Sequence, residues 1–452
     1  MPNRIITQTF TAPFYGIYSQ PSAPGALPPQ FWRSLHNVVL VGGMPQTRPG
    51  LVRINTSAFG SVGNTHMHGM GLFRNSSVNE MLVACGDKIQ KMTLPSGEPV
   101  SLTASVPSGA GWTSRTGSRT IFTQMGGETY IVNGVDGNLK YNGTSYRKMG
   151  LMTPTLAAPT KAAGAISATK LYLATFTVGA SDAVLESVTS ASISVTYAAQ
   201  QGTFTAPSVT DGDPQITHWN LYRSDDSGAT YQRVNGSAPV TLATNIVDNQ
   251  SAAYTNRTLP TGQTARLGPT GPLNWIAEHQ SRLLGVFASS ENVLRWSDVG
   301  TGAGGVYFLP EAWPTANFYA FPELGGLEIT GGISFHEWFI VFQDFGVWAI
   351  SGTLGSADAS IIKLLVASDQ RGAGIPFIHN ATVIENAIYF AAKDGVYKIT
   401  RMQIGNEPSL NLERLSDNVD ALYRTIDYSQ GGVSVYDRDY QRWMIFGVGA
   451  DA

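Results

Sequence analysis

A short hairpin pattern recurs along this chain and constrains its fold more than any other feature. Each copy has a short apolar strand, a turn that carries Gly or Asp, and a second strand that holds an aromatic residue or a Leu-Lys-Tyr type of end. One such hairpin cannot bury both of its faces, so several copies must pack against one another. The copies span Met81–Met92, Tyr130–Tyr141, Arg282–Trp296, Trp338–Ile350 and Ala387–Ile399, and a sixth opens near Tyr440–Phe446.

The spacing of the copies predicts the architecture. Within each flanking block they recur at roughly 45 to 55 residues, which is the spacing of propeller blades. Charged residues make up only 13% of the chain, which also holds 49 glycines and 24 prolines, so short strands joined by tight turns are favoured over solvated helices. We therefore predict an all-β protein, a β-propeller built from repeated hairpin blades. An antiparallel sandwich would give similar hairpins and stays the alternative.

A long gap between the second and third hairpins predicts an inserted domain. It begins with a Pro/Ala/Gly-rich linker, Pro154–Gly164, and ends with a second linker, Leu259–Pro272. The alternating strands between them are similar to those of a fibronectin type III domain, and Ile216–Ser224 resembles its penultimate strand. These strands are expected at Leu171–Val178, Ile193–Tyr197, His218–Arg223, Tyr231–Val234 and Ala253–Thr255.

The expected division of the chain follows from these linkers. Residues 1–155 hold the N-terminal segment and the first blades, residues 156–262 an inserted fibronectin III/Ig-like β-sandwich, and residues 263–452 the remaining blades. A guest domain is readily accommodated in a host when the guest's two termini lie close together.

Charge and cysteine content exclude several classes of protein. The formal net charge is −3, too low in basic residues for tight binding along a nucleic-acid backbone. Cys85 is the only cysteine, so no disulfide forms within the chain and zinc knuckles are excluded. No apolar run is long enough for a transmembrane helix, and the start of the chain does not resemble a signal peptide. We expect a soluble protein made in the cytoplasm.

The motif most like that of an enzyme lies in the inserted domain. Ser224–Tyr231 matches the Asp box of sialidases, Ser-x-Asp-x-Gly-x-Thr followed by an aromatic residue. In that family the box is a hairpin turn without a catalytic role, and it is repeated, whereas here it occurs once. We expect Asp226 and Gly228 to form a structural turn, with the Asp226 carboxylate in a buried hydrogen bond to the turn backbone. No catalytic residue and no cofactor are predicted.

Histidines and glycines supply the remaining candidates. His66 and His68 would lie on one face of a strand as half of a metal site, but no Cys or carboxylate is near them in sequence, so no metal is predicted. Glycine pairs permit close approach of backbones and are candidates for subunit or lumen contacts. These pairs are Gly42-Gly43, Gly325-Gly326 and Gly331-Gly332.

The order of several motifs resembles that of tail hub or nozzle proteins of short-tailed bacteriophages. The Gly-Gly…Arg-Pro-Gly-Leu pattern within Val41–Leu51 looks like their entry segment, and Tyr130–Thr144 is similar to their early blade. Arg282–Gly300 looks like the blade after their inserted sandwich, and Lys393–Lys398 followed by Arg414–Asp417 like the late blade and its exit. The resemblance covers most of the chain.

The resemblance implies a structural virion protein at the distal end of a tail, synthesised in the host cytoplasm. Such subunits form a homo-oligomeric ring, typically six-fold, around the channel through which DNA leaves, beside adaptor, tail fibre or tip proteins. DNA would pass without sequence-specific binding, which suits a slightly acidic chain. Low charge and many aromatic residues also suit large subunit interfaces. A glycan-binding adhesin propeller, and a sialidase-like propeller hydrolase, are the alternatives.

Overall fold

A computed structural model of the protein describes residues 67–101, 119–259, 271–321 and 328–437 with short gaps, residue 269, four short strands before residue 48, and residues 442–449. Regular structure in these residues is β, apart from the 3-10 helix η3 (Ile378–Asn380) and isolated helical turn residues. None of the described residues belongs to a helix with the length and hydropathy needed to span a membrane.

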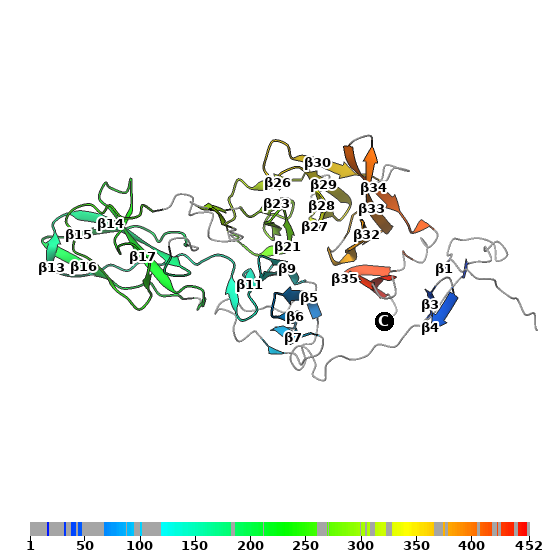
Figure 1. Ribbon diagram of the computed structural model, residues 1–452, viewed down its shortest axis with the longest axis horizontal. Helices are drawn as coiled ribbons and strands as arrows, with labels where there is room; N and C mark the ends of the chain where they lie inside the picture. Colours follow the sequence, from blue (N-terminus) through cyan, green and yellow to red (C-terminus); the bar gives the residue numbers. More distant parts are fainter. Residues whose placement is uncertain are drawn as a thin grey trace, which may run out of the picture. The chain divides into compact units, whose positions relative to one another are not determined.

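Five four-stranded antiparallel sheets form the repeating part of the chain (Figure 1). Within each sheet the strands are paired in the order in which they follow one another in sequence. The sheets consist of β5 (Met67–Arg74), β6 (Asn79–Cys85), β7 (Lys88–Thr93) and β8 (Val100–Ser101); β9 (Ile121–Met125), β10 (Glu128–Val132), β11 (Leu139–Tyr141) and β12 (Tyr146–Lys148); β21 (Leu273–His279), β22 (Arg282–Phe287), β23 (Val293–Trp296) and β26 (Phe318–Ala320); β27 (Ile329–Phe335), β28 (Trp338–Gln343), β29 (Gly346–Ser351) and β30 (Ser360–Leu364); and β31 (Ala381–Ile384), β32 (Ala387–Ala392), β33 (Gly395–Ile404) and β34 (Glu407–Arg414).

Four two-stranded pairings complete the sheets outside the inserted domain. They are β1 (Gly16–Ile17) with β2 (Phe31–Trp32), β3 (Val38–Val41) with β4 (Met44–Thr47), β24 (Gly300–Gly302) with β25 (Gly305–Tyr307), and β35 (Ile426–Asp437) with β36 (Arg442–Gly449). The chain separates into two compact units: Asn55–Pro322 is one, and Met1–Ile54 with Glu323–Ala452 is the other.

The five complete hairpins predicted from the sequence are confirmed. They are β6–β7, β10–β11, β22–β23, β28–β29 and β32–β33, the two middle strands of each four-stranded sheet. The sixth hairpin is β35–β36; it starts before Tyr440, which itself lies outside the described residues. The predicted fold class, all-β with propeller-type hairpin blades interrupted by a sandwich, is thereby confirmed.

The inserted domain is a sandwich of two antiparallel sheets. One sheet has the order β13 (Thr160–Ile166), β16 (Gln200–Phe204), β20 (Ile246–Asp248). The other has the order β15 (Ile193–Thr196), β14 (Thr169–Thr177), β17 (His218–Ser224), β18 (Gln232–Arg233), with β19 (Val240–Thr241) also on β17. The two sheets lie face to face (Figure 1). Their inner side chains form one core around Trp219, Tyr172 and Phe204.

The strand boundaries in the sandwich correct the sequence prediction at two points. The second half of the predicted linker Pro154–Gly164 is wrong, because Thr160–Ile166 is strand β13, paired with β16. Leu151 and Leu156, which precede β13, are already buried in the sandwich core. The strand expected at Ala253–Thr255 is also wrong: that segment is irregular, and the strand near it is β20.

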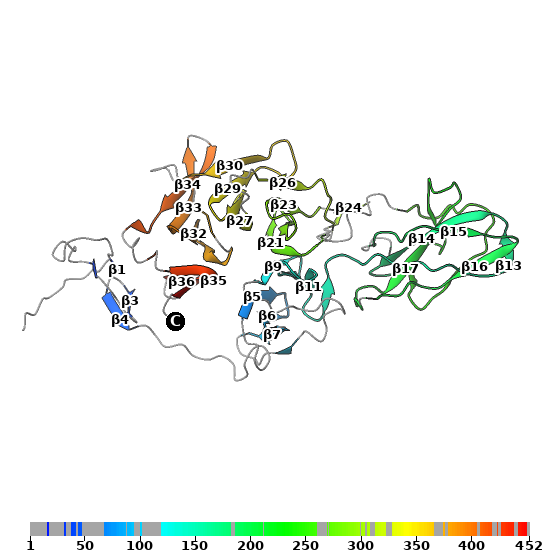
Figure 2. The same ribbon diagram turned by 180° about the vertical axis from the view of Figure 1, so that it is seen from behind.

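Sheets of the unit Asn55–Pro322 pack closely through positions without side chains. A Cβ atom on Gly71 of β5 would lie 2.2 Å from Cβ of Phe122 on β9, so only glycine permits this contact. The hydroxyl of Thr123, also on β9, donates to the carbonyl of Ile276 on β21 at 2.7 Å. The two strands β9 and β21 lie side by side in both views, although the inserted domain separates them in sequence (Figure 1, Figure 2).

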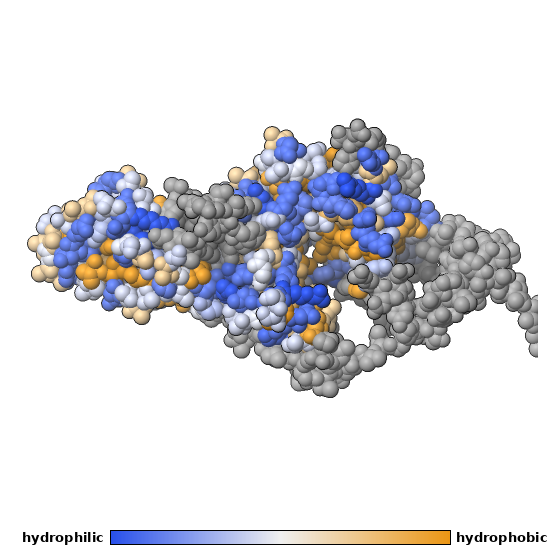
Figure 3. All heavy atoms as spheres, viewed as in Figure 1, coloured by the Kyte–Doolittle hydropathy of each residue, from blue (hydrophilic) through white to orange (hydrophobic). Residues whose placement is uncertain are grey.

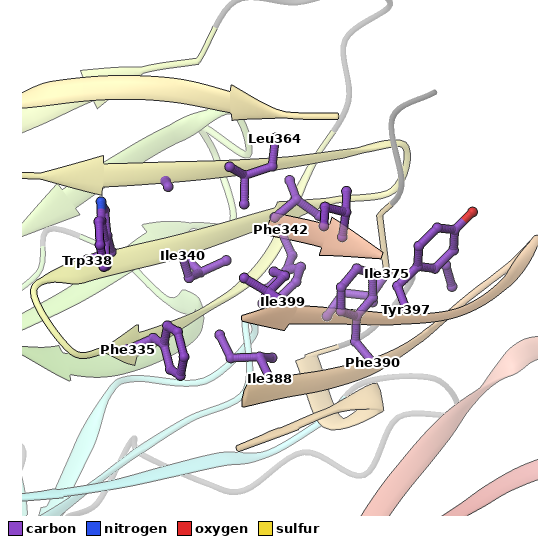
Figure 4. Packing of buried hydrophobic residues seen from close by; sticks show 14 residues of the cluster. Phe335, Trp338, Ile340, Phe342, Leu364, Ile375, Ile388, Phe390, Tyr397 and Ile399 are labelled. Carbon is purple, nitrogen blue, oxygen red and sulfur yellow. The ribbon is translucent and has the colours of Figure 1, made fainter. Parts of the chain in front are cut away.

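In the other unit, the sheets β27–β30 and β31–β34 share one apolar core. Phe342 of β28 and Phe390 of β32 meet edge to face with ring centroids 5.3 Å apart, and Phe390 stacks on Tyr397 at 5.4 Å. Figure 4 shows these side chains and those of Ile340 and Ile399 between the two sheets. Two four-stranded sheets thus bury their facing sides against each other, as neighbouring blades must.

His279, at the end of β21, makes the stability of its sheet depend on pH. Burial lowers the pKa of this imidazole to about 4, whereas an unfolded histidine titrates near 6.5. The unfolded chain therefore binds a proton that the folded chain does not, so stability is expected to fall as pH drops from about 6.5 to about 4, by about 3 kcal/mol in total. Chemical denaturation of the unaltered protein and of His279→Gln at several pH values checks this prediction. The substitution should make the free energy of unfolding less dependent on pH in this interval, and an equally steep dependence in His279→Gln contradicts the prediction.

Candidate functional site

The Asp-box motif folds as a tight turn between β17 and β18. Asp226 Oδ1 accepts from the backbone N–H of Thr230 at 2.9 Å, and the Thr230 hydroxyl donates to Oδ2 at 2.6 Å. The Ser224 hydroxyl donates to Asp226 Oδ1 and accepts from the N–H of Gly228, whose φ is +99°. These bonds, the Ser224 hydroxyl first, hold the pKa of Asp226 well below its usual value. The predicted structural turn at Asp226 and Gly228 is present.

One part of that prediction is wrong, because Asp226 is exposed and its hydrogen bonds are not buried. The hydrogen bonds of the carboxylate come from Ser224 and Thr230 of the same turn. The motif therefore organises the hairpin locally.

The arginine beside the turn already has carboxylate and backbone carbonyl partners. Arg223 is 0% exposed, and its Nη1 lies 3.1 Å from both oxygens of Asp248, which is also 0% exposed. Its Nη2 is 3.0 Å from Asp225, and its guanidinium carbon lies 4.5 Å from the centre of the Tyr254 ring. Burial alone lowers the pKa of Arg223, but Asp248 and then Asp225 raise it by more. Arg223 joins the two sheets of the sandwich and is not available to bind an acidic substrate.

Only one of the two candidate metal-binding histidines lies among the described residues. His68 lies in β5, where its carbonyl accepts from the N–H of Thr120 at 3.0 Å, while His66 is outside the described residues. In the part of the chain that the structure describes, no three His, Cys, Asp or Glu side chains come close enough together to hold a metal ion.

Of the glycine candidates, one pair can be placed. Gly331 and Gly332 lie inside the strand β27 and are buried. A Cβ on Gly331 would lie 2.4 Å from Cβ of Ile378 in η3, so this glycine serves packing within its own unit. Gly42, Gly43, Gly325 and Gly326 lie outside the described residues.

The last strand of each four-stranded sheet forms its outer edge, and such edges are usually protected against pairing with another chain. Three of these strands are short: β8 has two residues, and β12 and β26 have three each. β34 is longer but contains Pro408, which has no N–H, and the charged Glu413. β30 has five residues and neither proline nor acidic side chains.

β30 also carries exposed apolar side chains on both faces. Ile361 is 36% exposed, Ile362 is 45% exposed, and Leu365, just after the strand, is 38% exposed. The single charge of the strand, Lys363, lies over the Trp348 ring of β29 at 5.6 Å, so it is directed along its own sheet. Among the described residues β30 pairs only with β29. We define Ser360–Leu365 as the β30 edge and regard it as the best candidate for an assembly surface.

Figure 3 shows hydrophilic residues over much of the visible face, with smaller hydrophobic areas between them. The β30 edge is not predicted from the sequence, although the run Ile361-Ile-Lys-Leu-Leu-Val366 contains only one charge. An apolar run of this kind is normal for a buried strand, and only its position at the end of a sheet marks it as exposed.

Comparisons with known proteins leave the family open: no family model and no curated protein match the chain. Among solved structures, PorZ, an essential bacterial surface component of the type-IX secretion system of Porphyromonas gingivalis, is 12% identical, with a TM-score of 0.23 over 81% of this chain and 54% of PorZ. This chain thus spans about half the length of PorZ.

Two other solved structures are similar at the same level. AztD from Citrobacter koseri is 10% identical, with a TM-score of 0.25 over 78% of this chain and 96% of AztD. Hsv2 from Kluyveromyces lactis is 6% identical, with a TM-score of 0.23 over 78% of this chain and 98% of Hsv2. At these TM-scores no conclusion about function follows, and none of the three is a bacteriophage tail protein.

Proposed function

We propose that this chain is a ring-forming structural subunit of a bacteriophage tail tip, a nozzle through which DNA leaves the particle. The order of motifs in the sequence supports this: an entry segment at Val41–Leu51, early blades, an inserted sandwich, and late blades that end at Arg414–Asp417. The sheets and the sandwich occur in that order along the chain.

The observation that carries the proposal is the unprotected β30 edge. A strand edge with exposed isoleucines is a liability for a free monomer, because its unpaired N–H and C=O groups invite another chain. In a closed ring each subunit covers its neighbour through one heterologous contact, repeated until the rotation closes. The β30 edge of one copy would be covered by the next copy.

The chemistry of the Asp-box region supports a structural role over a catalytic one. Asp226 is held by Ser224 and Thr230, and Arg223 by Asp248 and Asp225, so each charged group already has protein partners. The low charge of the chain supports the DNA conduit, since a net charge of −3 cannot line a long cationic track that would hold phosphates. Adaptor and tail fibre or tip proteins are the partners that such a subunit would contact.

Light scattering on the purified full chain tests the role of the β30 edge. The protein is expected to form a closed oligomer, and Ile362→Lys is expected to shift it to monomers, because it places a charge in the subunit contact. Val247→Lys is the control, since Val247 is 51% exposed on the sandwich strand β20 and should not affect the oligomer. Monomers at all concentrations, or an oligomer equally stable in Ile362→Lys, contradict this assignment.

A glycan-binding propeller is the second candidate, and one observation favours it. Phe318 on β26 is 45% exposed, and the Arg295 guanidinium lies 5.5 Å from the centre of its ring. An exposed aromatic face beside a cation is a feature of sugar platforms. A glycan array distinguishes the two candidates: binding by monomers that Phe318→Ala abolishes supports the adhesin and contradicts the nozzle.

A further inference from the structure

The inserted sandwich follows its host sheet with almost no intervening chain. β12, the last strand of the sheet β9–β12, ends at Lys148, and Leu151 is already in the sandwich core with 2% exposure. Between them, the N–H of Met149 donates to the carbonyl of Asn138 on the same sheet at 3.0 Å. The segment that leaves β12, which we call the exit, is therefore hydrogen-bonded to the sheet up to the residue at which the sandwich begins.

Gln215, from the loop before β17, fastens the sandwich to this exit. Its side-chain nitrogen donates to the carbonyl of Lys148 at 2.9 Å and to that of Gly150 at 3.0 Å. The Asp213 carboxylate accepts from the same nitrogen at 2.6 Å. This nitrogen carries two hydrogens, which the three oxygens share, and the amide oxygen could not take its place because the three acceptors would repel it. Gln215 and Asp213 are both buried, at 4% and 2% exposure.

The returning chain is fastened to the same part of the sheet. The side chain of Asn138, between β10 and β11, donates to the carbonyl of Gly271 at 2.8 Å and accepts from the N–H of Leu273 at 2.9 Å. The N–H of Gly134 in the same loop donates to the carbonyl of Leu273 at 2.8 Å. Asn138 thus contacts both the departing and the returning chain, through its backbone and its side chain respectively.

We propose that Gln215 locks the inserted sandwich to the sheet β9–β12 where the chain leaves it, while Asn138 holds the returning chain to the same sheet, so that the sandwich is a fixed arm and not a module on flexible linkers. Each of the two amides is buried and has two backbone partners, and opening the contact would leave those backbone groups without hydrogen bonds. A fixed arm presents its surface in one orientation, so a partner that binds it does not have to restrict the motion of the domain. This inference does not depend on the tail function, because it concerns only the connection between the two parts.

Distance measurement between spin labels tests the lock in the full chain. Labels are attached to cysteines introduced at Thr144, in the sheet, and Ala162, in the sandwich, both exposed. The native Cys85 is 1% exposed and burial raises the pKa of its thiol, so it should not react with the label. We expect a narrow distance distribution in the otherwise unchanged protein and a broad one in Gln215→Ala. Equal distributions in the two proteins, whether broad or narrow, overturn the proposal.

A control variant separates the lock from the loss of any amide in the sandwich; its residue, Gln250, is exposed, unlike Gln215. Gln250→Ala removes the same kind of amide, which donates to the carbonyls of Ala252 and Ala253 at 3.3 and 3.1 Å, but both acceptors lie inside the sandwich. This variant should keep the narrow distribution; broadening equal to that of Gln215→Ala overturns the proposal. Gln215→Glu retains the shape but cannot donate, and should behave as Gln215→Ala does.

Trypsin provides a second readout, since Lys148 lies at the junction itself. Loss of two hydrogen bonds in Gln215→Ala is expected to increase cleavage after Lys148 by about tenfold or more, with cleavage after Lys161 in β13 unchanged. Asn138→Ala removes only the side-chain bonds to the returning chain and keeps the carbonyl that accepts from Met149, so it should change this cleavage much less. Cleavage after Lys148 that is already fast in the unaltered protein, or unchanged in Gln215→Ala, overturns the lock.

Discussion

Arg223→Ala is expected to lower the free energy of unfolding of the inserted sandwich by about 3–5 kcal/mol. The substitution leaves Asp248 buried without its cationic partner, although the hydroxyls of Tyr172 and Tyr254 still donate to it at 2.6 and 2.9 Å. A buried carboxylate without a countercharge is costly because water cannot solvate it. Chemical denaturation followed by tryptophan fluorescence measures the effect; Trp219, one of the nine tryptophans of the chain, is fully buried in the sandwich core and contributes to this signal.

Two comparisons make this prediction specific to the buried pair. Asp226→Ala, in the hairpin that follows Arg223, removes an exposed carboxylate and should change the unfolding free energy much less. The double variant Arg223→Met with Asp248→Leu removes both charges and should recover much of the loss, because apolar residues of similar size replace the pair. If Arg223→Ala unfolds at the same denaturant concentration as the unaltered protein, the ion pair does not hold the two sheets together.

Phe390→Ala is expected to destabilise the unit that contains β27–β34 by about 3–5 kcal/mol, as large-to-small substitutions of buried aromatic residues do. Phe390 is 0% exposed and contacts Phe342 of the facing sheet and Tyr397 of its own, so its loss leaves a cavity between two sheets (Figure 4).

Val383→Ala in the same sheet is the control for this second prediction. Val383 is 43% exposed on β31, and shortening it should have little effect. Thermal unfolding of both variants, followed by near-ultraviolet circular dichroism, compares them. Equal melting temperatures for Phe390→Ala and Val383→Ala would show that the two sheets are not joined through this core.

The hairpins could be predicted from the sequence because their information is local. In β6–β7 the pairing of Cys85 with Lys88 leaves a two-residue turn, and Gly86, its first residue, has the positive φ that the primed turns require there. Alternating apolar strands on either side then define the register. The inserted sandwich was recognised for the same reason, from its alternating strands and the breaks in composition on either side.

The structural features that are predicted wrongly, or not at all, from the sequence depend on residues far apart along the chain. β13 contains Lys161, Ala162, Ala163 and Gly164, a composition typical of a linker, and it is a strand because β16, some forty residues further along the chain, pairs with it. The junction residues Asn138 and Gln215 have partners 135 and 67 positions away in sequence, so no local pattern marks them. The Asp226 turn, whose partners all lie within four residues, was predicted correctly apart from its exposure.

Cryo-electron microscopy of the assembled particle that carries this protein tests the central claim most directly. The proposal predicts copies of the chain in a closed ring around a channel at the end of the tail, with the β30 edge of each copy covered by its neighbour and few Lys and Arg side chains facing the lumen. A single copy away from any channel, or a lumen lined by a dense ring of Arg and Lys, would contradict it.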